Sequence, residues 1–363
     1  GVTAGINSRT RAEYTEMGNI QKNPANGNYR ATQRTIGYLE GTADDVTAFI
    51  GFQGDLGWGD YSDASFGGSG YIGEAWVQFG KDLTLKAGRL GFNMDDGRLM
   101  GYDDWNSGNV YDGLLVGYNS DSFNLEILAT RGGLVGDNDL FVVNPSTKVG
   151  DIHVSIPIMY LTNAIHSGGG HDVSSFVAGL YAKQGGDFSW RVEGYFQQNT
   201  HEVDGEDAHS TNGLFVSAGV GFKVSDMLAP WVNFDYTGAK TDEDTHVFGT
   251  GLGDTHKFNG RSGIVAGAGA GGLIDVSLSN NFGELGPGSL SLDIHYMMLV
   301  DEEAAGADGV GIGTEIDIEY TVEISEQLSL VIGEALFLDQ DEGASDRDVS
   351  MHDWTYVQLT VAM

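Results

Sequence analysis

Carboxylates recur at every second position along one stretch of the chain. Over residues 311–324, apolar residues alternate with Glu315, Asp317, Glu319 and Glu323. Alternation with a period of two is typical of a β-strand, and it places these four side chains on one face. Such a row of carboxylates attracts cations when it faces water, and rings of Asp and Glu select cations in channels. The row is therefore a candidate for a pore lining.

Other charged side chains fall on the polar faces of other predicted strands. The acidic candidates are Glu74, Glu126, Glu193, Asp235 and Asp293. The basic candidates are Arg9, Arg11, Lys86, Arg191 and, from a loop, Arg98. Opposed acidic and basic groups across a water-filled lumen create a transverse field that orients polar solutes. Alternatively, the same charges keep the lumen wet and pair with neighbours across strands.

Sequence signals for catalysis are sparse. The nine His residues are scattered, without a His-Glu-x-x-His pair, and the chain has no Cys, no Gly-x-Ser-x-Gly elbow and no phosphate-binding loop. We therefore expect neither an enzyme nor a bound cofactor. Acidic loop clusters such as 242–244 and 301–303 have oxygen ligands suitable for Ca²⁺, although none matches the EF-hand spacing. Solvation, or bridging to lipopolysaccharide through divalent ions, is the other interpretation.

The elements that position these charges are short alternating segments. The chain has 363 residues with 56 Gly, 5 Pro and 38 aromatic residues (17 Phe, 15 Tyr and 6 Trp), and no apolar run approaches the length of a membrane-spanning helix. Short polar turns and long loops alternate between the segments, which is typical of a transmembrane, antiparallel, up-and-down β-barrel. We predict one all-β barrel domain over residues 1–363, with about 18 strands and 16 as the alternative. The even number depends on a strand at Leu140–Ser146, which contains Pro145.

The charge balance excludes one class of partner. With 18 basic and 52 acidic residues, the net charge is −34 and the pI about 4.2. Nucleic-acid binding needs Lys and Arg for phosphate contacts, so no nucleic-acid partner is expected. Three interpretations of the acidity stay open: a solvated surface suited to high salt, a cation-attracting pore, and divalent-ion binding in loops.

A motif-rich region lies between residues 71 and 133. It contains Glu74-Ala75, Gly88-Arg89, the run 97–101 (Gly-Arg-Leu-Met-Gly), Asp104-Trp105 and Asp112-Gly113. In order and spacing, these motifs resemble the alginate-export family of outer-membrane porins. About 45 residues carry the resemblance, and the Gln that follows Gly-Arg in that family is Leu90 here.

The resemblance implies structural roles for Arg89, Trp105 and Asp112, and an ion pair between Arg98 and Asp104 at the pore mouth. Arg89 and Asp112 share the phase of the apolar residues on their strands. They must therefore lie above the bilayer at the outer rim, or a bulge must turn them inward, because Arg facing the middle of the bilayer costs about 2–4 kcal/mol. The loop 93–110 is the best candidate for a constriction.

These patterns together predict a porin in the bacterial outer membrane. We expect a water-filled channel for passive diffusion of small hydrophilic solutes or ions, with a preference for cations. We expect the protein to be a monomer or a homotrimer, surrounded by outer-membrane lipid and lipopolysaccharide. The alternatives are a conduit for an anionic polysaccharide, as the resemblance suggests, and a plugged barrel whose loops bind a partner.

Overall fold

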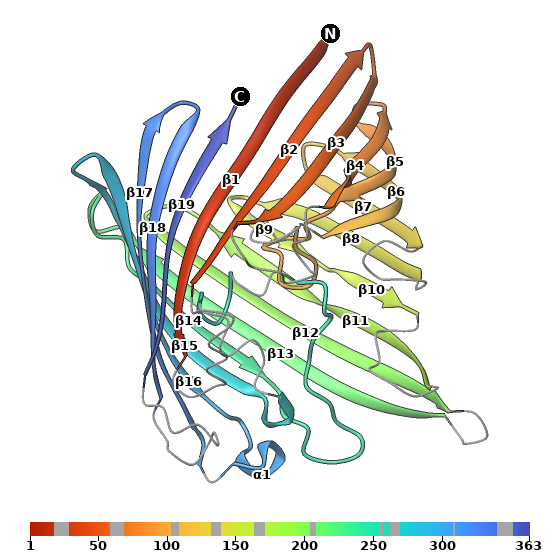
Figure 1. The fold of residues 1–363 in the computed structure, drawn as a ribbon. Helices are drawn as coiled ribbons and strands as arrows, with labels where there is room; N and C mark the ends of the chain where they lie inside the picture. Colours follow the sequence, from red (N-terminus) through yellow and green to blue (C-terminus); the bar gives the residue numbers. More distant parts are fainter. Residues whose placement is uncertain are drawn as a thin grey trace.

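The structure is a computed structural model that describes residues 1–17, 29–58, 69–102, 109–131, 139–162, 171–203, 208–253, 257–261, 269–307, 309–339 and 351–363. These residues form an antiparallel β-barrel, closed by the pairing of β1 (Val2–Met17) with β19 (Met351–Ala362) (Figure 1). Of the nineteen described strands, β9 and β10 are successive pieces of one strand, because both lie between β8 and β11. The barrel therefore has 18 strand positions, and the predicted fold class is confirmed.

The other elements follow in chain order: β2 (Tyr29–Ala43), β3 (Val46–Gly57), β4 (Ser69–Phe79), β5 (Leu83–Gly91), β6 (Val110–Asn119), β7 (Phe123–Arg131), β8 (Asp139–Val149), β9 (Ile152–Ser155), β10 (Ile158–Leu161), β11 (His171–Gln184), β12 (Phe188–Val203), β13 (His209–Phe222), β14 (Trp231–Thr237), the 3₁₀ turn η3 (Gly269–Gly271), β15 (Leu273–Leu285), β16 (Gly288–Met298), α1 (Glu302–Ala305), β17 (Gly311–Ser325) and β18 (Leu328–Asp339). None of the helices in these ranges is long and apolar enough to cross a membrane.

Proline shapes the one interrupted strand position. The sequence predicts a single strand over residues 152–165, but the structure breaks it between Ser155 and Ile158, at Pro157, which has no N–H to donate to a ladder. Pro145 lies inside β8 as predicted, and its carbonyl still accepts a hydrogen bond from the Ile156 N–H at 3.0 Å. Residues 163–165 of the predicted strand lie outside the described residues.

Short turns and long connections alternate at the two ends of the barrel. Both termini and the short turns, such as that between β17 and β18, lie at one end, whereas the helix α1 lies at the other (Figure 1). In outer-membrane barrels the short turns face the periplasm. In a barrel of that kind, the end that carries the termini and the short turns is the periplasmic end.

The two faces of the wall differ in the way that the alternation predicts. Large apolar side chains are exposed on the outer face, as Val192 and Phe196 of β12 illustrate, whereas Glu193 and Gln197 on the same strand are buried inside. An apolar outer belt is what hydrocarbon contact requires.

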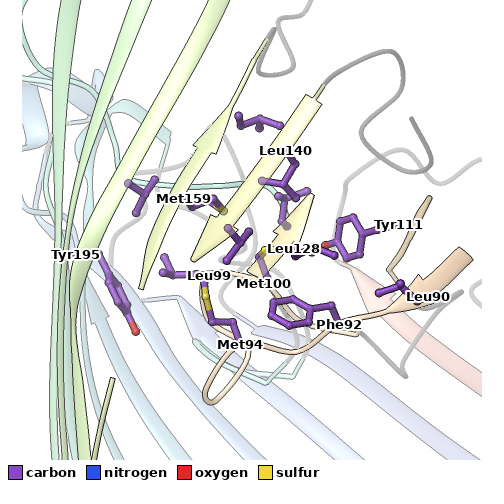
Figure 2. Close-up of a cluster of buried hydrophobic side chains, with 14 of the residues drawn as sticks. Leu90, Phe92, Met94, Leu99, Met100, Tyr111, Leu128, Leu140, Met159 and Tyr195 are labelled. Atoms are coloured by element: carbon purple, nitrogen blue, oxygen red, sulfur yellow. The ribbon is translucent and has the colours of Figure 1, made fainter. Parts of the chain in front are cut away.

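One part of the lumen is filled by an apolar cluster (Figure 2). The connection after β5 turns into the barrel, and we call residues 92–102 the first inner loop. Its buried side chains Met94, Leu99 and Met100 belong to the same cluster as Leu128 and Met159 from the wall. Burial of this apolar surface holds the loop inside the barrel.

A second connection fastens the first inner loop. Residues 238–253 and 257–261, here called the second inner loop, follow β14. The Gly101 N–H donates to the Leu252 carbonyl at 2.9 Å, and the Thr250 hydroxyl donates to the Leu99 carbonyl at 2.7 Å. Gly253 lies so close to the Arg98 carbonyl that a Cβ atom would come within 2.1 Å of it, so only glycine fits there.

Candidate functional site: the charged lumen

Arg98 of the first inner loop links two strands of the wall. Its guanidinium donates to Glu193 on β12 at 3.1 Å and to Asp235 on β14 at 2.7 Å. The three side chains are 9%, 1% and 4% exposed, so the ion pairs are buried. The guanidinium also lies 4.5 Å from the ring centroid of Phe215 and 3.8 Å from that of Phe258. The structure therefore brings together three of the predicted lumenal residues.

A second set of contacts holds the tip of the first inner loop. Asp96 accepts hydrogen bonds from Lys183 at 3.0 Å and from Arg191 at 3.3 Å. Burial alone raises the pKa of Asp96, but hydrogen bonds and the positive charges of Lys183 and Arg191 outweigh it and leave the pKa below its usual range. Beside it, Asp95 accepts from the Ser155 hydroxyl at 2.7 Å. The predicted residue Arg191 therefore anchors the loop.

A cavity of 490 Å³ lies beside this anchored loop. It is lined by Arg191 of β12, by strands β14 to β17 and by residues 257–261. The acidic side chains that line it are Asp235, Asp275, Asp293, Asp317 and Glu319, and the basic ones are Arg191, Lys257 and Arg261. His295 also lines the cavity. Without it, the described lining residues comprise five carboxylates and three cationic side chains.

Arg261 of the second inner loop pairs with the carboxylate row. Its guanidinium donates to Glu319 and lies 3.4 Å from Asp293. Burial acts to lower the pKa of Arg261, but the negative charges of Glu319 and Asp293 outweigh it and raise the pKa further above its ordinary value. On the neighbouring strand, the His295 Nδ1 lies 2.9 Å from an Asp275 oxygen, which also accepts from Asn259 at 3.0 Å.

The predicted carboxylate row divides between two environments. Glu315 and Asp317 are buried inside the barrel, and Glu319 meets Arg261 there. Glu323 is exposed near the end of β17 that leads into the short turn to β18, and it is not one of the residues that line the cavity.

The other predicted residues make contacts along the wall. Arg11 donates to Gln358 at 2.8 and 3.0 Å, and Arg9 lies opposite Arg34 in the ladder between β1 and β2. Lys86 lies over the Trp76 ring at 3.8 Å, Glu74 accepts from the Trp76 indole N–H at 3.2 Å, and Glu126 accepts from Asn144 at 3.5 Å. None of these residues lines the 490 Å³ cavity.

Arg89 and Asp112 form a bidentate ion pair, with N···O distances of 2.7 and 2.8 Å. The ladder between β5 and β6 is regular from Leu83 to Gly91, so no bulge turns the pair inward. The side chains are 37% and 39% exposed and lie near the loop ends of their strands. The regular ladder therefore gives no support to the bulge alternative of the sequence analysis, and the outer-rim alternative stays a prediction.

Two motif residues, Asp104 and Trp105, lie outside the described residues, and so does the predicted ion pair of Arg98 with Asp104. Leu90, where the resembling family has Gln, is fully buried in the apolar cluster of Figure 2. The departure from the family motif therefore coincides with the attachment of the first inner loop to the wall.

Three important residues were missed by the sequence analysis. Asp275 alternates with Ile274 and Val276 in a predicted strand, so the period-two signal could have found it. Arg261 and Asn259 lie in a long Gly-rich connection without periodicity, and no sequence signal indicates that this loop enters the lumen.

The acidic loop residues have structural roles in this arrangement. Asp301 caps α1 by accepting a hydrogen bond from the Ala304 N–H, and Asp242 accepts from the Asp244 N–H. Across the described part of the chain, no group of three or more His, Asp or Glu residues is arranged to hold a metal ion. The acidic cluster at residues 340–348 lies outside it.

Several solved structures have a similar fold at low sequence identity. Acinetobacter baumannii OccAB1 is similar over 100% of this chain and 96% of its own, with a TM-score of 0.68 and 10% identity. Pseudomonas aeruginosa OccK11 (OpdR) has a TM-score of 0.64 and 13% identity over 100% of this chain and 96% of that one. P. aeruginosa OpdK, solved with vanillate, has a TM-score of 0.64 and 12% identity over 99% and 98%.

No family model matches the chain, and the comparison with curated proteins finds no match either. The likeness is therefore one of fold, and the fold is that of an outer-membrane porin barrel.

Proposed function

We propose that this chain is an outer-membrane porin, one barrel domain, through which small hydrophilic solutes diffuse passively with a preference for cations. A closed barrel of 18 strands is wide enough for an aqueous lumen, and the apolar outer belt suits a bilayer. Outer-membrane lipid and lipopolysaccharide would surround the belt. The porins of similar fold are channels, which supports a transport role over an enzymatic one.

The excess of carboxylates around the 490 Å³ cavity is the observation that carries the cation preference. Arg98 neutralises part of the charge of Glu193 and Asp235, and Arg261 does so for Asp293 and Glu319, but the acidic side chains still outnumber the basic ones. In a narrow aqueous lumen with walls of low dielectric, such an excess attracts cations and repels anions.

A plugged barrel is the second candidate, and the apolar cluster of Figure 2 favours it. The first inner loop fills the lumen along the wall from β6 to β13, so a barrel that binds a partner with its outer loops is compatible with this packing. The cavity on the opposite side of the loop favours the open channel.

The motif resemblance over residues 71–133 would imply, more specifically, a role in alginate export. A uronate polymer carries one carboxylate per sugar, so its conduit needs Lys and Arg along the path. The carboxylates at the cavity oppose that cargo. We therefore propose that the shared motifs, including the pair of Arg89 with Asp112, serve the barrel wall rather than the choice of solute.

Single-channel recording separates the candidates. The purified protein inserted into a planar bilayer in KCl is expected to give stable, ohmic current steps. Bilayers into which the folded protein has inserted, shown by protease protection, but which carry no current would contradict the channel and support the plugged barrel.

A further inference from the structure

Three aromatic rings form a row across neighbouring strands of the wall. Tyr38 of β2, Phe49 of β3 and Trp76 of β4 stack with ring centroids 5.6 and 5.4 Å apart and interplanar angles of 22° and 11°. Trp76 packs against the apolar cluster inside the barrel, whereas Leu39, on the opposite phase of β2, is 50% exposed on the outer face. The aromatic row therefore faces the lumen and not the lipid.

The aromatic row leaves part of its surface accessible. Each of its three side chains is only partly buried. Tyr38 lies directly opposite Gly5 on β1 and Gly51 on β3. A Cβ atom at Gly5 would overlap the Tyr38 ring, and one at Gly51 would come within 3.1 Å of the Phe49 ring. Because neither glycine has a side chain, ring surface beside them stays open to a solute.

Polar side chains form a second row next to the rings, on the side of the short turns. In the ladders of β2 to β5, the members that lie opposite one another are Thr42, Thr47, Gln78 and Lys86. Thr47 lies two residues from Phe49 and Gln78 two residues from Trp76, so the polar row and the aromatic row share one face. Hydroxyl and amide groups both donate and accept hydrogen bonds.

This combination of rows selects one class of solute. An apolar platform with donors and acceptors along its edge fits a molecule that has an apolar face and a hydroxylated rim. A pyranose with equatorial hydroxyls has this shape, because its C–H groups point to the faces and its hydroxyls to the rim. The negative face of an aromatic ring attracts such C–H groups, and a few placed polar groups then fix the orientation. A planar anion would instead need several cations, but Lys86 is the one cationic member of the polar row, and its Nζ lies 3.8 Å from the Trp76 ring centroid.

We propose that the aromatic row is a binding platform for neutral sugars. Its rings contact the C–H face of a pyranose, while Thr47 and Gln78 exchange hydrogen bonds with the hydroxyls. This proposal rests on the proposed channel function, because it names a solute class that the lumen holds on its way through. The platform adjoins the first inner loop, since Trp76 packs against the cluster to which that loop belongs.

The test is block of the single-channel current by cellotriose in KCl. Sorbitol is the comparison solute, because it carries hydroxyls but has no ring, and benzoate is the planar anion. Cellotriose is expected to interrupt the current at concentrations at which sorbitol and benzoate do not. Phe49→Leu keeps an apolar side chain but removes the middle ring, and it is expected to raise the half-blocking concentration of cellotriose about fivefold. Phe52→Leu is the matched control on the same strand, because Phe52 is 53% exposed on the outer face, and it is expected to keep the block.

Far-UV circular dichroism verifies that each variant is folded, and Tyr38→Leu takes the place of Phe49→Leu if that variant is not. Equal block by cellotriose and sorbitol, stronger block by benzoate, or an unchanged cellotriose block in the ring variant would overturn the platform while leaving the channel intact. A protein that conducts no current contradicts the proposed function instead. Calorimetric titration with cellotriose, in a detergent without a sugar head group, then decides the platform separately: binding that the ring variant weakens supports it, and the absence of binding overturns it.

Discussion

Removal of Arg98 is expected to leave two buried carboxylates without their cation. The side chains of Glu193 and Asp235 are 1% and 4% exposed, and their bonds to Arg98 measure 3.1 and 2.7 Å. Breaking a buried ion pair by removing one partner costs about 3–5 kcal/mol. Part of that cost is avoided if the first inner loop leaves the lumen and lets water reach the carboxylates. We therefore expect Arg98→Ala to lower the free energy of unfolding by about 3 kcal/mol, toward the lower end of the range.

Urea unfolding of the micelle-bound protein, followed by tryptophan fluorescence, measures this change. Arg131→Ala is the matched control, because Arg131 is 84% exposed and its pairing with Asp139 at 3.6 Å is worth about 1 kcal/mol or less. The triple variant Arg98→Met, Glu193→Gln, Asp235→Asn is expected to recover most of the loss, since no uncompensated charge is left buried. If Arg98→Ala costs no more than Arg131→Ala, the account of the lumenal ion pairs is refuted.

Three further predictions concern the rim, the loops and the apolar cluster. A double-mutant cycle of Arg89→Ala with Asp112→Ala is expected to give a coupling of about 0.2–1 kcal/mol, because both side chains are more than a third exposed; a coupling above about 3 kcal/mol would indicate a buried site instead. Burial and the nearby His201 lower the pKa of His246 to about 4, below the 6.5 of the unfolded chain. The unfolded loop therefore gains protons first as the pH falls, so the docking of residues 238–253 is expected to weaken from pH 6.5 down to pH 4, measured by amide hydrogen exchange, whereas His246→Gln should show no such dependence. Leu90→Gln, which restores the residue of the resembling family, is expected to cost about 1–3 kcal/mol in urea unfolding because it buries an amide in an apolar cluster; an unchanged midpoint would contradict the packing of Leu90.

The barrel could be predicted from the sequence because each strand must present an apolar face to lipid. In β17, Ile316 and Ile318 face outward and Glu315 and Asp317 face inward. This alternation is a local pattern that consecutive residues of the sequence reveal. The alternation of turns and loops then indicated the strand number, whereas the break at Pro157 and the short helix α1 were not predicted.

The lumen could not be predicted to the same depth. Arg98 meets Glu193 and Asp235 across 95 and 137 residues of chain, and nothing in the local pattern specifies those partners. Arg261 and Phe258 reach the cavity from a loop without periodicity. Such contacts depend on how two loops pack inside a closed barrel, which is a property of the whole fold.

The reversal potential of the open channel under a KCl gradient tests the central claim most directly. With the higher salt concentration on one side of a planar bilayer, the carboxylate excess at the cavity predicts a potential of the sign that K⁺ permeation gives. Its magnitude should shrink as the salt is raised, because ions screen the lumenal charges. A reversal potential of the opposite sign, showing preference for Cl⁻, would contradict the account and place the acidic excess outside the path of the ions.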